Sequence, residues 1–257
     1  MSTATLTPTA WWLLLRNQLR GFVREPAAAG FNLVVPFFIV LVQAFAYGSS
    51  AVGDDLPGYR VADVLPIGAA VTYIMIIGVF GMGVGLASMV ESRTLAGFRL
   101  RPGGVPSILS AYGLVLIALT VLGLVLSTVV LALGWGIHAP ARPLVLLPAT
   151  LLGCVVFLAA GACVAGATGS PRSAQGVSSA VFFPLLFLSG AMFPLDGFPT
   201  ALRALAEALP GYHLYEVTAW GWVGSQPVPW PSLGYLLGLG LALAALAAWL
   251  FRRREDL

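Results

Sequence analysis

Six long segments of this 257-residue sequence contain no Asp, Glu, Lys or Arg. Each is long enough to supply the roughly 20 apolar residues that an α-helix needs to cross a lipid bilayer. Because charged side chains are costly in hydrocarbon, such segments are candidate membrane spans. The uncharged segments are 26–53, 64–90, 102–141, 143–171, 173–195 and 217–251.

The composition agrees with a membrane location. Only 9% of the residues are charged and 59% are hydrophobic, whereas soluble domains have about 25% and 45–50%. Gly, Pro and Trp residues interrupt the two longest segments and leave room for one helix in each. We predict an all-α, polytopic membrane protein that forms one domain over residues 1–257. Its six transmembrane helices are predicted near 28–48, 65–89, 107–134, 144–168, 174–193 and 232–251.

Arginine is distributed unequally over the segments between the predicted spans, and the chain has no lysine. Only Arg60, Arg142 and Arg203 fall on one side. The other arginines fall on the opposite side, at Arg16, Arg20, Arg24, Arg93, Arg99, Arg101, Arg172, Arg252, Arg253 and Arg254. Because short cytoplasmic loops are enriched in basic residues, we predict a multi-pass protein of the cell membrane with both termini in the cytoplasm.

The absence of lysine excludes several kinds of functional site. A P-loop, a lysine Schiff base and a Ser–Lys dyad cannot form, so the chain cannot bind ATP through a Walker motif. We expect no metal or cofactor on this chain, no catalytic residues and no nucleic-acid partner, since the arginines occur in short clusters beside apolar segments.

Residues 1–26 are predicted to form an amphipathic helix on the inner leaflet of the bilayer. Thr7 can cap a helix that begins at Pro8. Such a helix could anchor the chain to lipid or could also contact a partner. Its apolar face consists of Trp12, Leu15, Leu19, Phe22 and Val23, and the opposite stripe consists of Arg16, Arg20 and Arg24.

A second amphipathic segment lies between the second and third predicted spans, over residues 90–102. It combines Leu95, Phe98 and Leu100 with charged residues, and Pro102 ends it. A short helix of this kind can bind a soluble partner through a few apolar side chains while the charges set the register. A solvated loop is the alternative interpretation. The charged residues are Glu91, Arg93, Arg99 and Arg101.

The segment 194–216 is predicted to lie on the outer side of the membrane. Pro194 ends the fifth span, and Pro199 begins a short helix over 200–209. That helix is too short to span, so it lies in the outer interface or re-enters the bundle. The apolar face of this helix includes Leu202, Leu205 and Leu209.

The order of these motifs resembles that of the ABC-2 type permeases of ATP-binding-cassette exporters, over nearly the whole chain. The residues that carry the resemblance are Ser189, Gly190, Phe193, Pro194, Leu209 and Pro210, together with Glu91, Thr94, Leu95 and Pro102. The chain looks more similar to the short drug and antibiotic-resistance exporters than to the polysaccharide exporters, because it has no large added domain. It differs from the family at Arg93, where Gly usually precedes Thr, and at Gly211 and Tyr212, where many members have an Asn-Pro turn.

The resemblance implies the transmembrane subunit of an exporter for an amphipathic drug, antibiotic or lipid-like substrate. Two copies of a separate ATP-binding subunit would bind ATP and Mg²⁺, and a second membrane subunit, identical or different, would complete the pore. The coupling helix to the ATPase would comprise Glu91, Arg93, Thr94, Leu95, Phe98, Arg99, Arg101 and Pro102. The exoplasmic gate would comprise Pro194, Pro199, Leu202, Leu205, Leu209 and Pro210.

Two other function classes remain open at this point. An ion-coupled secondary transporter needs an ionisable group within the membrane, and the predicted spans have none in their interiors. A rhomboid-like intramembrane protease needs a Ser close to a His. The sequence places His138 in an outer loop and His213 at the membrane surface, so neither is expected to face a serine of the spans.

Overall fold

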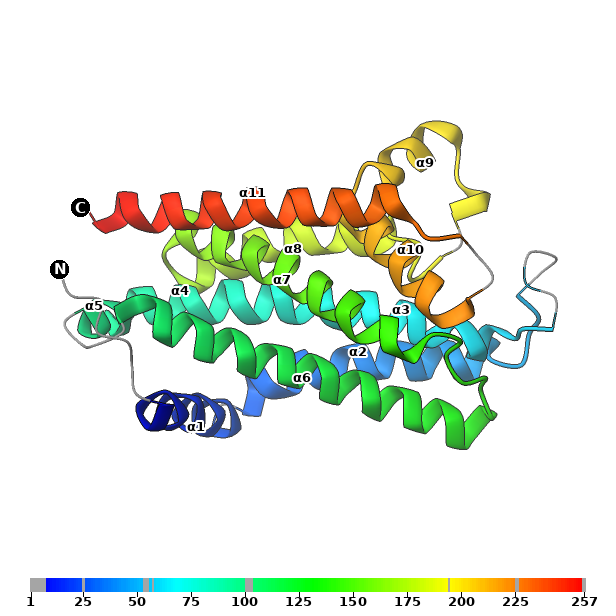
Figure 1. Ribbon diagram of the computed structural model, residues 1–257, viewed down its shortest axis with the longest axis horizontal. Helices are drawn as coiled ribbons and strands as arrows, with labels where there is room; N and C mark the ends of the chain where they lie inside the picture. Colours follow the sequence, from blue (N-terminus) through cyan, green and yellow to red (C-terminus); the bar gives the residue numbers. More distant parts are fainter. Residues whose placement is uncertain are drawn as a thin grey trace.

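The computed structural model is an elongated bundle of α-helices (Figure 1). It describes residues 8–24, 26–52, 56, 58–99, 104–193, 195–224 and 227–255. Within these ranges the regular structure is helical, apart from one isolated β-bridge between Ala51 and Arg60. The elements are α1 (Pro8–Arg24), α2 (Pro26–Tyr47), α3 (Val61–Met75), η1 (Ile76–Met82), α4 (Gly83–Glu91), α5 (Thr94–Arg99), α6 (Gly104–Trp135), α7 (Pro143–Thr168), α8 (Pro171–Phe187), η2 (Leu195–Gly197), α9 (Thr200–Glu207), α10 (Pro210–Val223) and α11 (Trp230–Glu255).

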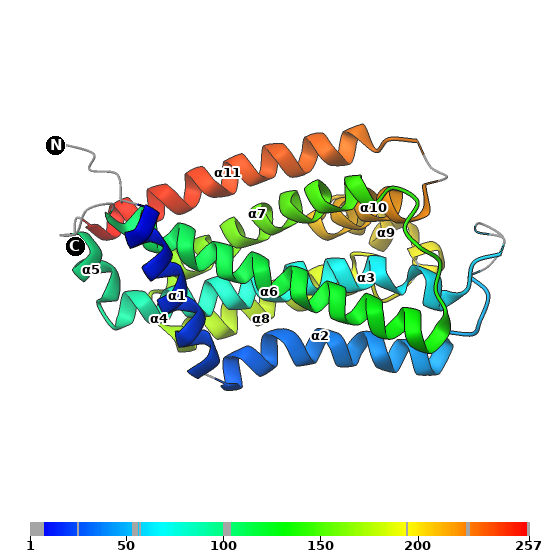
Figure 2. The same cartoon turned by 60° about the horizontal axis from the view of Figure 1, so that its bottom comes forward.

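The long helices α2, α3–η1–α4, α6, α7, α8 and α11 follow the long axis of the bundle (Figures 1 and 2). At one end lie α1, α5 and the C-terminal part of α11, and we call this the α5 end. At the opposite end lie α9, α10 and the loop between α2 and α3, and we call this the α9 end. Helix α1 runs across the bundle axis rather than along it (Figure 2).

The centre of the bundle is the continuous helical segment Val61–Glu91, which packs against α2, α6, α7, α8 and α10. In its most apolar part, 94% of the residues are buried. The middle of this segment is a π-helical stretch, η1, where the backbone comes very close to α7. A Cβ atom added to Gly161 would lie 2.1 Å from the carbonyl oxygen of Gly78, so this helix contact depends on glycine.

Four helices of the described part are long and apolar enough to cross a membrane. They are Val61–Glu91, Ser107–Trp135, Pro143–Thr168 and Trp230–Arg253, and they agree with four of the predicted spans. The predicted spans 28–48 and 174–193 correspond to α2, which contains the shorter apolar stretch Asn32–Tyr47, and to α8, which has 17 residues.

Helix α8 ends at Phe187, earlier than the predicted span. The N–H of Leu188 makes the last α-helical bond, to the carbonyl of Pro184, and the N–H of Ser189 then bonds to the carbonyl of Leu186, which tightens the last turn. Gly190 then has a φ of 82°, a left-handed conformation that ends helical structure.

The predicted helix 200–209 is wrong at its C-terminal end, since α9 ends at Glu207. Leu209 is extended, with φ −98° and ψ 146°, and Pro210 occupies the first turn of a further helix, α10. The sequence analysis did not predict α10. Its buried face packs against α3, α7 and α11, and consists of Gly211, Leu214, Val217, Thr218, Gly221, Trp222 and Val223.

Candidate functional site

The first candidate region is the junction between α4 and α5, which contains the residues predicted to contact an ATPase. Helix α4 ends at Glu91, and the hydroxyl of Ser92 donates to the carbonyl oxygen of Ser88 at 2.8 Å. The hydroxyls of Ser92 and Thr94 are 2.9 Å apart and share a hydrogen bond. These bonds hold α5 at a fixed turn from α4, with Glu91, Arg93 and Thr94 exposed.

Arg93 has a φ of 55° and is the only non-glycine residue of the described part with a positive φ. The left-handed region costs an ordinary L-residue about 1–2 kcal/mol, whereas glycine adopts it freely. The resemblance expects glycine at this position, and glycine adopts this conformation without strain. At this position the chain carries a strained backbone and an exposed guanidinium at the tip of the turn.

Leu95 is only 6% exposed and belongs to the main hydrophobic core. Of the apolar residues predicted to face a partner, Leu95 therefore anchors α5 on the bundle instead. The side chains of Phe98 and Arg99, and the whole of Arg101 and Pro102, lie outside the described residues.

Helix α1 lies at the same end and was predicted to be amphipathic. Leu15 packs inward, at 9% exposure, while Trp12 and Leu19 are exposed together with Arg16 and Arg20. Thr7 and the side chains of Phe22, Val23 and Arg24 lie outside the described residues. The helix thus presents both large apolar side chains and arginines away from the bundle, as an interfacial helix does.

The second candidate region is the predicted gate at the α9 end. Leu202 and Leu205 of α9 are exposed, while Ala206 is fully buried beneath them. Arg203 and Glu207 form an exposed ion pair one turn apart, with Nε and Oε1 at 3.1 Å. Pro199 caps α9, and Leu209 and Pro210 connect it to α10. Pro194 lies outside the described residues.

A polar network joins α10 to α11 next to the gate. The carboxylate of Glu216 accepts hydrogen bonds from the hydroxyls of Tyr212, at 2.8 Å, and of Ser232. The ring of His213 bonds to the same Ser232 oxygen at 2.8 Å and stacks on Tyr235 with centroids 4.0 Å apart. The hydroxyl of Tyr235 in turn donates to the carbonyl of Ala208 at 2.9 Å.

This network changes the acid–base properties of its members. Burial lowers the pKa of His213 below its ordinary value, and the nearby Glu216 carboxylate offsets only part of this effect. Burial also raises the pKa of Tyr212, to about 12, and the Glu216 carboxylate that accepts its hydrogen bond adds to the rise. Both rings are therefore neutral near pH 7.

The contact between Ser232 and His213 was not foreseen, and it bears on the protease alternative. In a catalytic triad the His takes the Ser proton and a carboxylate orients the His. Here the Ser232 hydroxyl donates to Glu216, and the carboxylate contacts the serine rather than the histidine. Ser232 is also only 1% exposed. The arrangement is that of a structural hydrogen-bond network between two helices.

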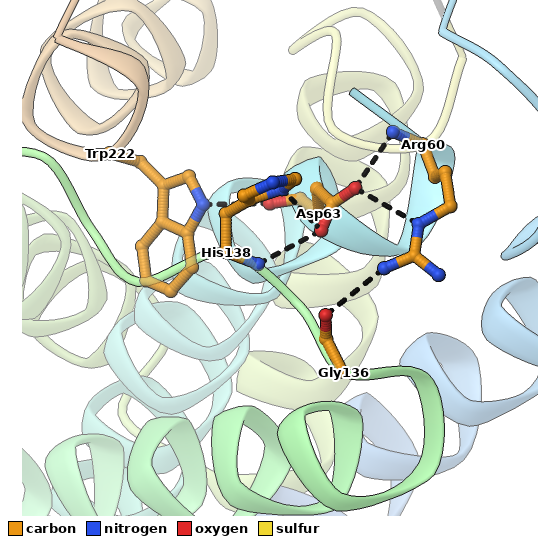
Figure 3. Close-up of polar contacts among 5 residues, drawn as sticks. All are labelled: Arg60, Asp63, Gly136, His138 and Trp222. Carbon is orange, nitrogen blue, oxygen red and sulfur yellow. Dashed lines mark hydrogen bonds and ion pairs between the residues drawn. The ribbon is translucent and has the colours of Figure 1, made fainter. Parts of the chain in front are cut away.

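A third polar cluster, also at the α9 end, surrounds Asp63 in the first turn of α3 (Figure 3). Its buried carboxylate accepts from the backbone N–H of Arg60 at 2.8 Å and of His138 at 2.9 Å, through different oxygens. The Arg60 and His138 side chains contact the same two oxygens, at 3.4 and 2.9 Å. The indole of Trp222 donates to the Asp63 carbonyl at 2.7 Å. Asp63 therefore connects α3, the α6–α7 loop and α10.

The sequence analysis placed His138 in an outer loop and assigned no role to Asp63 or Glu216. One local feature of the sequence could have indicated the role of Asp63. An acidic residue in the first turn of a helix can accept hydrogen bonds from the free backbone N–H groups there. The partners from α10 and the α6–α7 loop carry no such local signal.

The family model described as "ABC-2 type transporter" matches residues 9–221. The chain belongs to the ABC-2 type transporter family. A search of the curated proteins gave no match. The matched range extends from α1 into the last turn of α10, so it includes both the α4–α5 junction and α9.

Membership identifies this ABC-2 protein as a membrane-embedded subunit of an ABC-type transporter, without an ATPase site of its own. Together with its apolar helices, it makes the chain a membrane protein that works with an ABC ATP-binding partner. In this ABC-2 subunit the candidate groups are exposed positions at the two ends of the bundle. No group of three or more potential metal ligands occurs among the residues that the structure describes.

Proposed function

We propose that the chain is the transmembrane subunit of an exporter that moves an amphipathic drug, antibiotic or lipid-like substrate out of the cell. A separate nucleotide-binding subunit would supply the energy by hydrolysing ATP. The observation that carries this proposal is the α4–α5 junction. It exposes Glu91 at the end of α4, Arg93 in the turn and Thr94 at the start of α5, while Leu95 of α5 is buried in the bundle. Motion imposed on such a helix is passed to the central segment α3–η1–α4.

Both the charges and the shape of the α4–α5 junction would contribute to its contact with the ATPase. Glu91 and Arg93 supply opposite charges beside each other, and such charges orient a partner surface. The same role is proposed for the α5 residues and the residues just after it, namely Phe98, Arg99, Arg101 and Pro102. Arg16 on α1 is exposed at the same end of the bundle and would add a second contact with the ATPase.

We further propose six membrane crossings with both termini in the cytoplasm. The alternating direction of α2, α3–η1–α4, α6, α7, α8 and α11 along the bundle axis supports this arrangement (Figures 1 and 2). The arginine distribution supports the orientation, since the predicted cytoplasmic side corresponds to the α5 end. Cysteine labelling tests it. An impermeant thiol reagent on intact cells should modify Asp55→Cys and spare Arg172→Cys, and the reverse pattern would overturn the orientation.

A second membrane subunit, either a copy of this chain or a different one, would complete the pathway with two ATPase subunits. Helix α8 supports this proposal, because its exposed surface mixes Gln175 with apolar groups such as Val181, Phe183 and Phe187. A helix that faces lipid alone has no need for the amide. This surface therefore suits a subunit contact beside a substrate path.

The exposed leucines of α9 would then form the exit gate, with the amphipathic helix as a lid over the substrate path. A disulfide from Leu202→Cys or Leu205→Cys to the partner subunit should stop transport, and reduction should restore it. Transport at the full rate with both positions locked would leave α9 as a plain cap.

Reconstitution tests the function as a whole. The chain should co-purify with a soluble ATPase, and proteoliposomes with both should transport an amphipathic dye only with ATP and Mg²⁺. Transport that persists without ATP and stops with an ionophore would identify a secondary transporter. Cleavage of a model substrate by the chain alone would identify a protease.

Variants of the coupling surface sharpen this test. Glu91→Ala combined with Phe98→Ala should abolish transport while expression and ATP binding by the partner persist. Arg172→Ala, an exposed arginine at the start of α8, is the matched control and should transport normally. Full transport by the double variant with normal ATPase stimulation would refute the coupling role.

A further inference from the structure

We propose that a polar pocket at the α5 end binds the phosphate of an anionic lipid headgroup. The pocket has a volume of about 380 Å³, within the range of small-molecule sites, which is roughly 300–1,000 Å³. It lies where α1 meets the end of α4 and the start of α5. Helix α1 contributes Asn17, Gln18 and Arg20, and the α4–α5 junction contributes Ser88, Ser92 and Thr94.

The chemistry of the lining suits a phosphate. Arg20 is the only charged residue among the described residues that line the pocket, and no carboxylate lines it. Its guanidinium forms no ion pair with any described residue. Arginine binds phosphate oxygens through two parallel N–H bonds. A site with one cation, two amides and several hydroxyls therefore selects an anion rich in oxygen acceptors.

The hydroxyl groups of the junction can complete such a site. Ser92 donates to the carbonyl oxygen of Ser88 and is also bonded to Thr94, which is exposed. Thr94 can turn its hydroxyl toward a ligand while Ser92 keeps its bond to Ser88. Binding would thus exchange the Ser92–Thr94 hydrogen bond for one to the ligand and leave the bond from Ser92 to Ser88 in place.

The position of α1 identifies a lipid as the source of the phosphate. Helix α1 crosses the bundle axis at the α5 end (Figure 2), and its exposed side chains include Trp12, Leu13 and Leu19. Large apolar side chains on such a helix insert at the boundary between headgroups and acyl chains, where tryptophan is enriched. Polar groups on the flank of α1 then lie at the depth of lipid headgroups. Basic pockets at the cytoplasmic face bind anionic headgroups in the same way.

This site has a consequence for the junction. A headgroup bound between Arg20 and Thr94 would tie α1 to the turn that carries Arg93. Lipid composition would therefore affect how firmly α5 is held against α1.

Binding can be measured without ATP or a partner, so the result is independent of the proposed transport function. The full chain is purified in a neutral detergent, and native mass spectrometry follows titration with dioleoyl phosphatidylglycerol or dioleoyl phosphatidylcholine. Wild type should bind phosphatidylglycerol more tightly. Arg20→Gln should weaken that binding roughly tenfold, as loss of a charged hydrogen-bond donor does. Arg16→Gln removes the same charge from the same helix, outside the pocket lining, and should bind like wild type.

Each of the other outcomes would overturn the proposal. Equal weakening by Arg16→Gln and Arg20→Gln would indicate attraction by net charge without a pocket. Equal binding of the two lipids would exclude a phosphate-selective site for an anionic headgroup. Displacement of phosphatidylglycerol by equimolar glycerol 3-phosphate would assign the pocket to a soluble phosphate compound. Loss of ATPase capture by Arg20→Gln with unchanged lipid binding would assign it to an acidic protein surface. If Arg20→Gln fails to fold, Thr94→Val removes a lining hydroxyl and should weaken phosphatidylglycerol selectively.

Discussion

Replacement of Asp63 by asparagine tests whether the carboxylate at the α9 end holds three parts of the bundle together. The side chain of Asp63 is fully buried, and its two oxygens each accept one backbone N–H, from Arg60 and from His138, in partly buried hydrogen bonds. Asparagine has nearly the same shape but only one acceptor oxygen, and its amide nitrogen would face the second N–H group. One backbone donor must therefore lose its partner.

The expected loss of stability follows from the number of backbone N–H groups that lose their acceptor. A buried donor left without an acceptor costs about 1–3 kcal/mol, which is an upper range for these partly buried N–H groups. The Arg60 and His138 side chains are 40% and 56% exposed, so water takes over much of their interaction with the lost charge. For a chain of this size 1 kcal/mol corresponds to roughly 2–4 °C of melting temperature. Asp63→Asn should therefore lower the melting temperature by about 2–12 °C.

Thermal unfolding of the purified chain in detergent measures this loss. Glu207→Gln is the matched control, because its partner Arg203 and Glu207 itself are 50% and 45% exposed and such pairs contribute about 0–1 kcal/mol. The melting temperature of Asp63→Ala should be lower than that of Asp63→Asn, since both backbone donors lose their acceptor in the alanine variant. A melting temperature of Asp63→Asn equal to that of Glu207→Gln would refute the reasoning.

Three further predictions concern backbone conformation, helix contact and pH. Arg93→Gly should raise the melting temperature relative to Arg93→Ala, because only glycine relieves the positive φ; equal values would contradict a strained turn. Gly161→Val should lower the stability of the protein by about 1–3 kcal/mol, since a Cβ there would meet the backbone of η1. Gly176→Val is the control and should be as stable as wild type, because the space around Gly176 is open. The folded-state pKa of His213 lies below its ordinary value of 6.5, so the contribution of neutral His213 to stability is present above that pH and is lost as the pH falls. Between pH 7.5 and 5.5 the melting temperature should therefore fall more steeply for wild type than for His213→Gln. Parallel curves would refute this prediction.

Most of the long helices could be predicted from the sequence. The cost of charge in hydrocarbon removes charged residues from a span whatever its neighbours are, so uncharged segments indicate these helices without knowledge of the packing. The predicted span 144–168, for example, agrees closely with α7, Pro143–Thr168.

Helix α10 was not predicted because its sequence has a low propensity for helix formation. Gly211 and Gly221 lower its helix propensity, and both lie in close contact with neighbouring side chains. Tertiary packing thus outweighs propensity over these 14 residues. A signal was present at the ends, where Pro210 occupies the first turn and Gly224 has a left-handed φ of 75°.

The candidate site was predictable in position but not in the orientation of its side chains. The pattern of residues 90–102 predicts a short amphipathic helix, and α5 occurs there. A six-residue helix does not indicate which apolar side chains face the bundle, so the burial of Leu95 required the structure. His138 bonds to Asp63 from 75 positions away in the sequence, and no local pattern encodes that contact.

The contacts at the α9 end hold α10 to the bundle through more hydrogen bonds than they hold α9. The backbone N–H of Ala141 donates to the carbonyl of Trp222 at 2.9 Å, and the indole of Trp222 donates to the carbonyl of Asp63. These two bonds join α3, the α6–α7 loop and α10. Helix α9 is tied to the bundle by a buried Ala206 and by the bond from Tyr235 to Ala208, while most of its surface is exposed. The extended residue Leu209 follows directly. A gate at this end would therefore move α9 about the 208–209 link, while α10 keeps its place against the central segment.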